Sequence, residues 1–303
     1  MGVKKLVKRV INKLPYCSSI YEENQLYKKN ACYPPGHFHS PIVSVEDIKI
    51  RERNIWEYNS DLIYDIDLKV KEQLNLIKMF ERYYTQIPFK ENKQKGLRYY
   101  FKNDYYSYTD GIILYSFIRH FNPKHIIEIG SGYSSALMLD TNECFCNNNI
   151  SLTFIEPFPD RLKSLLKESD NSNCIIIEKP VQDVPANILS NLNDGDILFI
   201  DSSHVSKTGS DVNYLLFNII PKLKKGVLIH FHDIFYPFEY TKEWVFGGRN
   251  WNEIYLLKAF LMNNNQYEIL FFSHYMHQKY TEVFKNMPLV YNDLGCNLWI
   301  RKK

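Results

Sequence analysis

Short apolar runs alternate with helical stretches over residues 96–303. The runs are rich in Ile, Val, Leu and Phe, which is typical of strands buried on both faces of a parallel sheet. They lie at 126–130, 152–156, 175–178, 197–201 and 227–231. Apolar positions at helical spacing lie at 133–141, 160–167, 185–191 and 211–224, and again after Trp251. The alternation predicts an α/β fold with helices on both faces of a mostly parallel sheet.

The carboxyl-terminal part of the chain does not follow this alternation of strands and helices. Residues 267–272 and 297–300 have the composition of strands, and we expect no compact helix between them. Two strands joined in this way favour an antiparallel closing pair. The whole pattern therefore predicts a Rossmann-like sheet of seven strands.

The first part of the chain has a different pattern. Residues 1–14 place apolar side chains on one helical face and Lys and Arg on the other. Such a basic helix either packs against its own domain or a second copy, which we favour, or lies on an anionic membrane surface. A Pro- and Gly-rich loop follows at 33–41, and a helical pattern at 61–84. We expect an amino-terminal helical and loop cap, residues 1–95, before a domain at 96–303.

Composition narrows the classes of partner. The 303 residues include 37 Lys and Arg against 34 Asp and Glu, a net charge of +3, so no strong field is available to hold nucleic acid. The six cysteines are scattered, which indicates reduced thiols rather than a disulfide framework. No apolar run approaches the roughly 20 residues of a membrane span, and no secretory signal is evident. We expect a cytoplasmic protein, with peripheral contact at the inner membrane face as the lesser alternative.

A glycine turn follows the first strand of the pattern. Glu128-Ile129-Gly130-Ser131-Gly132 runs from a buried strand directly into a helix, where backbone comes close to a ligand. Glu156 ends the next strand, where an acid accepts hydrogen bonds from ribose hydroxyls. Ser134 occupies the position of a third glycine, which disfavours a nicotinamide dehydrogenase. Together these residues predict an adenosine-binding site.

Polar side chains end the fourth and fifth strands. Asp201 and His204 follow one strand, and His232 and Asp233 the other, so all four are expected at one sheet edge. Strand alternation puts His230 on the same face as His232, and we expect only His232 to leave the core. Two interpretations remain open: a magnesium or manganese site made by the four residues, or His204 or His232 acting as general base. A third interpretation is that these polar residues only cap the ends of the strands.

Candidate contacts for an acceptor lie in two loops. Arg249, Trp251 and Asn252 combine a cation, an aromatic face and an amide before a helix, which suits a molecule with hydroxyl groups. The equal alternative is an ordinary loop in which Asn250 and Glu253 cap that helix. His39, on the proline-rich loop, is a further candidate, although a loop histidine is more often a surface residue.

The motif Glu128-x-Gly130-x-Gly132 and the acid Glu156 resemble class I methyltransferases that use S-adenosylmethionine, over about residues 96–303. The resemblance implies that the glycine turn contacts the methionine moiety, that Glu156 holds the ribose, and that Gln182 and Asp183 flank adenine. The full expected cofactor set is Glu128, Gly130, Ser131, Gly132, Tyr133, Ser134, Glu156, Gln182, Asp183 and Asp201.

Segments 34–38, 200–204 and 230–233 look more particularly like bacterial methyltransferases associated with polysaccharides and secondary metabolites. This resemblance and the loop at Trp251 imply O-methylation of a small molecule, a sugar or a glycan. The polar residues at the ends of the fourth and fifth strands leave assistance by a divalent metal open. Two alternatives stay open: a non-catalytic nucleotide-binding or scaffold protein, and another metal enzyme on the same fold.

Overall fold

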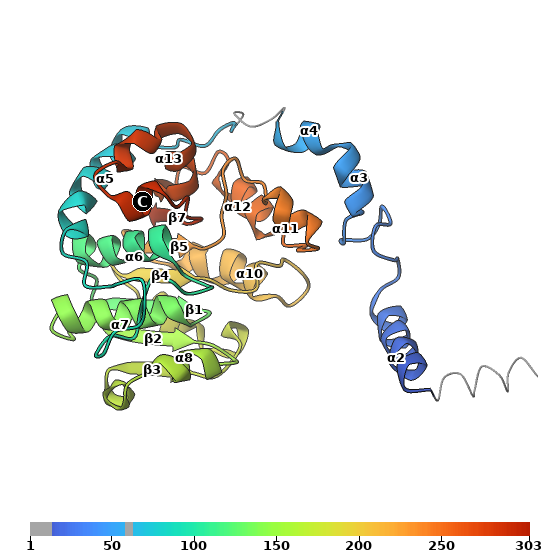
Figure 1. Cartoon of the computed structure of the whole chain (residues 1–303), viewed down its shortest axis with the longest axis horizontal. Helices are drawn as coiled ribbons and strands as arrows, with labels where there is room; N and C mark the ends of the chain where they lie inside the picture. The colour runs from blue at the N-terminus through green and yellow to red at the C-terminus, as the bar shows by residue number, and fades with distance from the viewer. Residues whose placement is uncertain (1–13, 58–62) are drawn as a thin grey trace, which may run out of the picture. The chain divides into compact units, whose positions relative to one another are not determined.

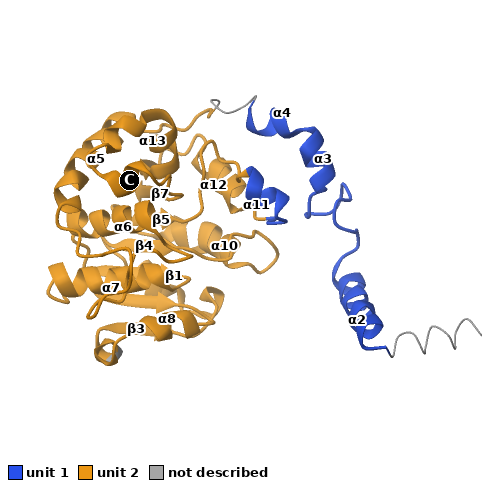
Figure 2. Ribbon diagram, in the orientation of Figure 1, with its two compact units in different colours: residues 1–58, 242–250 blue, residues 59–241, 251–303 orange. Residues whose placement is uncertain are grey.

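The computed structural model describes residues 14–57 and 63–303. The chain forms two compact units, coloured separately in Figure 2: residues 1–58 with 242–250, and residues 59–241 with 251–303. The expected basic helix at 1–14 lies, apart from Leu14, outside the described residues and stays a prediction. Within the described ranges, every helix is too short or too polar to cross a bilayer.

The first unit consists of short helices and loops. Its helices are α2 (Pro15–Asn30), α3 (Val45–Ile50), α4 (Glu52–Trp56) and α11 (Lys242–Phe246). Trp56 meets Phe246 edge to face at 5.8 Å, and Lys242 Nζ pairs with Glu52 Oε1 at 2.7 Å. None of the residues of these four helices is buried, and these two contacts between described residues are aromatic and ionic.

The second unit is built on a seven-stranded sheet (Figure 1). The strand order is β3-β2-β1-β4-β5-β7-β6, with β1 to β5 parallel and β7 antiparallel to both of its neighbours. The strands are β1 (His125–Ile129), β2 (Ser151–Ile155), β3 (Cys174–Ile177), β4 (Ile197–Ile200), β5 (Leu228–Phe231), β6 (Tyr267–Phe272) and β7 (Leu298–Lys302). The expected Rossmann-like sheet and its antiparallel closing pair are confirmed.

Helices cover both faces of this sheet. They are α5 (Val70–Tyr84), α6 (Tyr108–Phe121), α7 (Tyr133–Phe145), α8 (Asp160–Leu165), α9 (Ala186–Ser190), α10 (Asp211–Tyr214), α12 (Glu253–Leu261), α13 (Ser273–Tyr280) and α14 (Pro288–Tyr291). Parallel crossovers are right-handed, so α7 and α8 cover one face and α10 the other. Helices α5 and α6 continue the first layer beside α7. The expected cap of residues 1–95 therefore does not coincide with the first unit, because α5 belongs to the second unit.

Two predicted helices differ from the observed ones for local reasons. The pattern at 61–84 becomes a helix only from Val70, because Asp65 and Lys69 have left-handed backbone with φ of 57° and 50°. The predicted helix at 211–224 is α-helical only as far as Tyr214, then widens into a π turn over Leu215–Ile219 and tightens into a 3₁₀ turn. Pro221 in that last turn has no N–H to continue the helical bonding.

The expectation of no compact helix between the two tail strands is wrong. Helices α13 and α14 lie between β6 and β7, with a 3₁₀ turn over Thr281–Phe284. Five consecutive residues at the start of α13, from Ser273 to His277, are buried. A helical turn that is buried on all sides lacks the amphipathic stripe by which a helix is predicted from sequence.

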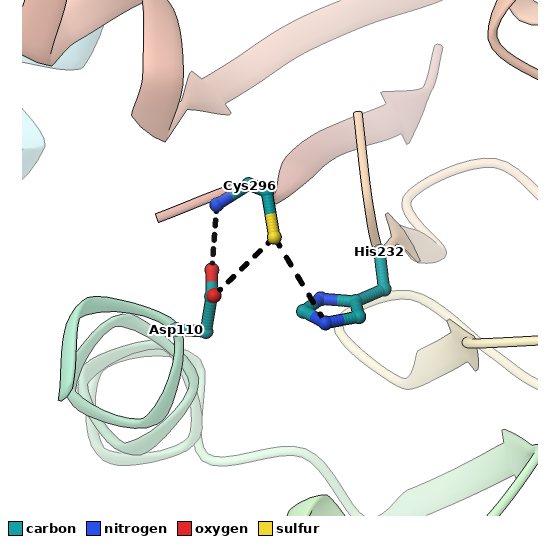
Figure 3. A group of neighbouring side chains, drawn as sticks. All are labelled: Asp110, His232 and Cys296. Carbon is teal, nitrogen blue, oxygen red and sulfur yellow. Dashed lines mark hydrogen bonds between the residues drawn. The ribbon is translucent and has the colours of Figure 1, made fainter. Parts of the chain in front are cut away.

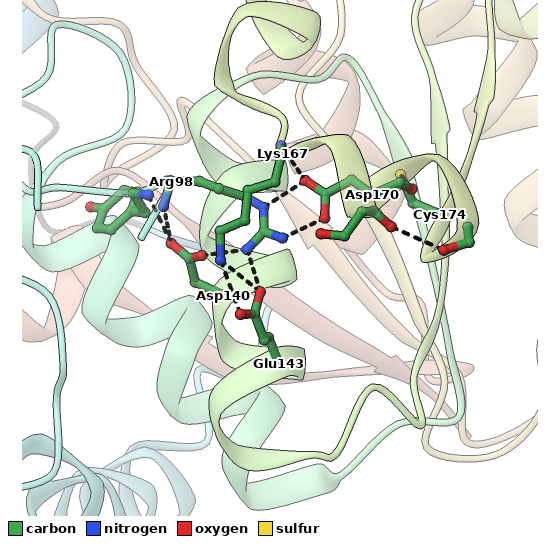
Figure 4. Close-up of polar contacts among 9 residues, drawn as sticks. Arg98, Asp140, Glu143, Lys167, Asp170 and Cys174 are labelled. Carbon is green, nitrogen blue, oxygen red and sulfur yellow. Dashed lines mark hydrogen bonds and ion pairs between the residues drawn. The ribbon is translucent and has the colours of Figure 1, made fainter. Parts of the chain in front are cut away.

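A buried ion-pair cluster fixes the loop before α6 to α7 and to the 3₁₀ turn over Glu168–Ser172 (Figure 4). Arg98 is 2% exposed and donates to Asp140, Glu143 and Asp170. Asp140 Oδ2 also accepts the backbone N–H groups of Arg98 and Tyr99, each at 2.8 Å. Each buried carboxylate therefore has a charged and a neutral donor, which is the condition for tolerating charge in a core.

Candidate active site

A cleft of about 420 Å³ lies at the carboxyl ends of β1, β2 and β4. In a doubly wound sheet, ligands bind at this edge, where the strand order reverses between β1 and β4. The cleft is lined by Ile129, Gly130, Ile155, Glu156, Pro157, Phe158, Pro180, Val181, Gln182, Asp201, Ser202, Ser203, Lys207, Gly209, Ser210 and Asp211.

The first glycine of the turn is required by its surroundings. Gly130 has φ of +82°, and a Cβ built there would lie 1.7 Å from the backbone oxygen of Asp201. Gly132 is different: its φ of 175° is ordinary extended backbone, and a Cβ would meet Arg161 Cδ at 3.2 Å. Only a residue without a side chain lets the β1 turn pass this close to the end of β4.

Glu128 stabilises this turn through hydrogen bonds in the core. Its carboxylate is fully buried and accepts hydrogen bonds from the hydroxyls of Ser134 and Ser135. Ser135 Oγ in turn accepts the Gly132 N–H at 3.0 Å. Burial raises the pKa of Glu128 to about 8, although both serines act in the opposite direction. Glu128 and Ser134 are thus hydrogen-bonded to one another, and neither lines the cleft.

Glu156 joins the ends of the first two strands. It lines the cleft, and its carboxylate accepts the backbone N–H of Ser131 at 3.1 Å and of Phe158 at 2.7 Å. The Ser131 hydroxyl is buried without a hydrogen-bond partner. A charged acceptor and an unused hydroxyl therefore stand together at the glycine turn.

Gln182 and Asp183, expected together near adenine, differ in environment. Gln182 lines the cleft, and its Nε2 donates to Gly209 O at 2.8 Å while its buried Oε1 has no partner. Asp183 is exposed and is not among the lining residues. Of these two residues, only Gln182 presents a free acceptor to the cleft.

An aromatic and cationic group lies beside the turn. Tyr133 Oη lies 2.9 Å from Tyr100 Oη, and its ring stacks on Tyr105 at 6.1 Å. The Arg161 guanidinium lies 3.6 Å from the centre of the Tyr105 ring. Tyr105 and Arg161 were not predicted, because neither belongs to the glycine motif.

The structure brings Asp201, His204 and Asp233 together. His204 Nε2 lies 3.3 Å from Asp201 Oδ1 and 3.6 Å from Asp233 Oδ2, and its Nδ1 lies 2.9 Å from Glu253 Oε2. His204 and Asp233 both have left-handed backbone, with φ of 58° and 57°. These turns direct the side chains that end β4 and β5 toward each other.

Opposite charges stabilise this group. Burial alone would lower the pKa of His204, but Asp201 and Glu253 raise it well above the ordinary value. Burial alone would raise the pKa of Asp201, but His232 and His204 bring it below the ordinary value. The carboxylates around the ring therefore make His204 a stronger base than an isolated imidazole.

Glu253 was predicted only as a helix cap. It is 1% exposed, and it contacts His204 instead of closing a capping box with Asn250. The observed cap residue is Asn252, which makes no side-chain cap bond. The capping interpretation of this segment is therefore wrong for both Asn250 and Glu253.

Of the two histidines at the end of β5, His230 lies in the core as expected, whereas His232, contrary to expectation, does not leave it. His230 is buried between Phe199 at 3.8 Å and Trp299 at 4.8 Å, and neither ring nitrogen has a hydrogen-bond partner. Burial holds its pKa well below the ordinary value, so it is a neutral core residue. His232 was expected to leave the core but is only 4% exposed, because Tyr106 packs over it at 5.1 Å.

The expected four-residue metal set divides into two groups. The ligand atoms of Asp201, His204 and Asp233 lie within 4.8 Å of one another. His232 instead lies with Asp110 and Cys296, whose ligand atoms are also within 4.8 Å (Figure 3). Asp110 and Cys296 were missed by sequence reasoning, although both the start of α6 and the start of the antiparallel β7 fall at this edge of the sheet.

The expected acceptor contacts lie in different units. In the second unit, the Trp251 ring packs on His204 at 4.4 Å, and Asn252 Oδ1 accepts the Ser206 N–H at 2.6 Å. In the first unit, the Arg249 guanidinium lies over Trp244 at 4.1 Å, and exposed His39 packs on Phe38 at 3.9 Å. A common role for these residues stays a prediction.

Comparisons with known proteins agree with this architecture. Residues 127–234 match the family model described as a methyltransferase domain. An uncharacterised protein of Archaeoglobus fulgidus is 33% identical over 183 residues, which cover 58% of this chain and 82% of the relative. The chain carries a class I methyltransferase domain. It belongs to the same family as the archaeal protein, and class I methyltransferases take their methyl group from S-adenosylmethionine.

Solved methyltransferases show weaker similarity. The S-adenosylhomocysteine-bound Podospora anserina methyltransferase PaMTH1 is 18% identical, with a TM-score of 0.41, covering 88% of this chain and all of that chain. A CmcI structure described as Mg-SAM is 15% identical, with a TM-score of 0.36, covering 63% of this chain and 69% of that one. The fold assignment depends on the strand order and not on these similarities.

Proposed function

We propose that this methyltransferase binds S-adenosylmethionine in the cleft beside Glu156 and methylates a hydroxyl oxygen of a sugar, a glycan or a similar polar small molecule. The observation that supports the proposal is that the cleft and the His204 group share a residue, Asp201. Gly130, Glu156 and Asp201 line the cleft, and Asp201 lies 3.3 Å from His204, whose other ring nitrogen contacts Glu253. Cofactor-binding groups and a proton acceptor therefore share one edge of the sheet.

The cleft residues fit the cofactor. Glu156 would accept hydrogen bonds from the ribose hydroxyls, and the free Oε1 of Gln182 would accept one from the adenine amino group. The backbone at Gly130 and the unpartnered Ser131 hydroxyl would face the methionine moiety. Bound S-adenosylmethionine supplies an electrophilic methyl group on a sulfonium.

Other expected cofactor residues would act indirectly. Glu128 and Ser134 hold the turn in shape through their mutual hydrogen bond. Gly132 and Tyr133 begin α7, where backbone N–H groups favour an anionic group such as a carboxylate. Asp183 would act only through the backbone of its turn, because its side chain is outside the cleft.

Methylation of oxygen also requires removal of a proton. Glu253 holds His204 Nδ1, and in the neutral ring Nε2, which faces Asp201, would accept the proton of an acceptor hydroxyl. The carboxylates around the ring then stabilise the imidazolium that forms. Trp251, packed on this ring, offers the apolar face of a sugar a surface beside the base.

A second candidate mechanism uses a divalent cation. Asp201, His204 and Asp233 would hold magnesium or manganese, and such an ion makes a coordinated hydroxyl more acidic. The observation that favours it is the contact between Glu253 and His204 Nδ1, because metal-binding histidines usually have their second nitrogen held by a carboxylate. Chelation followed by addition of single ions separates this mechanism from the histidine base.

The proposed function is tested with methyl-labelled S-adenosylmethionine and fractionated oligosaccharides. We expect a labelled product with a methyl-sized increase in mass, and a loss of about 10²- to 10⁴-fold in turnover for His204→Gln. His120→Gln, in the last turn of α6, is the matched control and should retain turnover. Binding of the cofactor without transfer to any acceptor would support the non-catalytic alternative.

A further inference from the structure

The geometry points to a closed, four-ligand zinc site made by Asp110, His232, Asp233 and Cys296. Figure 3 shows three of these side chains converging from separate elements of the second unit. Asp110 lies in the first turn of α6, His232 directly follows β5, and Cys296 lies just before β7. Asp233 adds a carboxylate from the residue after His232.

The distances around Cys296 and His232 are close to those of a tetrahedral ion. Cys296 Sγ lies 3.4 Å from Asp110 Oδ2, 3.2 Å from Asp233 Oδ1 and 4.0 Å from His232 Nε2. His232 Nε2 lies 3.6 Å from Asp233 Oδ1. Zinc bonds of about 2.3 Å to sulfur and about 2.0 to 2.1 Å to nitrogen and oxygen give tetrahedral edges of roughly 3.3 to 3.6 Å. Three of the four separations lie within about 0.1 Å of this range, and an ion would shorten the 4.0 Å between Cys296 Sγ and His232 Nε2. The ligand atoms of Asp110, His232 and Cys296 all lie within 4.8 Å of one another.

The polar groups of this cluster are not satisfied by one another. The Cys296 thiol has one hydrogen, yet its sulfur lies between two carboxylates. Asp110 Oδ1 accepts the Cys296 N–H and the Asn297 amide, which leaves Oδ2 facing only the sulfur. A divalent cation would bind the thiolate and both carboxylates at once.

His232 provides an independent observation. Its side chain is 5% exposed, and its Nδ1 has no hydrogen-bond partner. Its other nitrogen, Nε2, faces both Cys296 and Asp233. A buried imidazole that directs one nitrogen at a thiol and a carboxylate has the position of a metal ligand.

The donor set indicates which ion would bind and what it would do. A thiolate and an imidazole favour zinc over magnesium or calcium, which prefer oxygen ligands. Four protein ligands leave no open coordination position, as in structural zinc sites. The ion would fasten the start of α6 and the segment before β7 to the end of β5.

This site is separate from the group around His204. The two oxygens of Asp233 face different partners: Oδ2 lies 3.6 Å from His204, whereas Oδ1 faces His232 and Cys296. Zinc bound to Asp233 Oδ1 would therefore leave the contact between Asp201 and His204 unchanged. Asp201 variants can then distinguish the two groups experimentally.

Cobalt is the spectroscopic probe, because it replaces zinc in such sites and reports a thiolate ligand directly. Chelated full-length protein is titrated with Co²⁺ alone. We expect stoichiometric binding, the intense visible bands of a tetrahedral ion and a thiolate charge-transfer band in the near ultraviolet. Cys296→Ser should abolish the charge-transfer band, and Asp110→Asn should keep it but weaken affinity by at least about tenfold.

Two controls keep the result specific. Cys174→Ser removes another partly buried thiol and should leave the band unchanged, as should Asp201→Asn. A wild-type protein without the band, or a band that persists in Cys296→Ser, overturns the proposal. A band lost in Asp201→Asn overturns the claim of a separate site.

Zinc itself gives a readout that does not depend on spectra. Added zinc should raise the thermal unfolding temperature of the wild type and leave that of Cys296→Ser unchanged, since an ion bound only by the native state stabilises it. Equal stabilisation of both proteins would overturn the proposal even where Cys296→Ser is less stable than the wild type.

Discussion

Gly130 lies so close to Asp201 that a Cβ at position 130 would be 1.7 Å from the Asp201 carbonyl oxygen. Gly130→Ala must therefore move the end of β4 or the turn after β1. We expect it to lower the free energy of unfolding by about 2 to 5 kcal/mol, from left-handed strain of about 1 to 2 kcal/mol and overpacking of about 1 to 3 kcal/mol.

Gly96→Ala is the matched control for this prediction. Gly96 has φ of +89°, close to that of Gly130, but nothing lies within 4 Å of the Cβ position. We expect only the strain, about 1 to 2 kcal/mol. Equal losses in urea unfolding of the two variants would show that the contact with Asp201 is unimportant.

Arg98→Met should be among the most destabilising single changes. It leaves the buried carboxylates of Asp140 and Asp170 without their cation, at a cost of about 3 to 5 kcal/mol. The control is Lys163→Met, which breaks an ion pair with Glu178 whose partners are both about half exposed. That exposed pair is worth at most about 1 kcal/mol. Similar losses for the two variants in chemical unfolding would contradict the assigned role of the buried cluster.

Glu128 should make stability depend on pH. Its folded pKa of about 8 lies above the ordinary value of 4.5, so between these values the folded state holds more protons than the unfolded state. The contribution of Glu128 to the free energy of unfolding is complete below the unfolded pKa of 4.5 and is lost as the pH rises through the folded pKa of about 8. Glu128→Gln removes this loss.

The measurement is the difference in unfolding free energy between wild type and Glu128→Gln at about pH 5 and about pH 9. We expect the wild type to lose on the order of 1 to 4 kcal/mol relative to the variant at the higher pH. A difference that does not change with pH would mean that Glu128 is ionised throughout.

The parallel strands could be predicted from sequence because each is a short apolar run with a clear end. The positions of Gly130 and Glu156 beside the cleft could be predicted for a related reason, since they depend on a local motif and on the strand that precedes each residue. The same logic placed Asp201, His204 and Asp233 at one edge, and the structure brings these three together.

The missed residues depend on contacts between distant segments. Asp110 and Cys296 are 186 residues apart, and they meet because α6 starts and β7 begins at the edge where β5 ends. His232 is buried by Tyr106, which precedes α6. Glu253 has a capping position in the sequence, and only the fold shows that it holds His204. Periodicity and local motifs contain no signal for such contacts.

The central claim is that the cleft beside Glu156 binds S-adenosylmethionine, and calorimetric titration with S-adenosylhomocysteine tests it most directly. We predict a single site in the wild type and an affinity lower by about 1.5 to 3 kcal/mol in Glu156→Ala, because the ribose loses a charged acceptor. Glu178→Ala, which removes a half-exposed carboxylate paired with Lys163, should bind like the wild type. Absence of binding to the folded wild type, or equal affinity in Glu156→Ala with the fold intact by circular dichroism, would contradict the account.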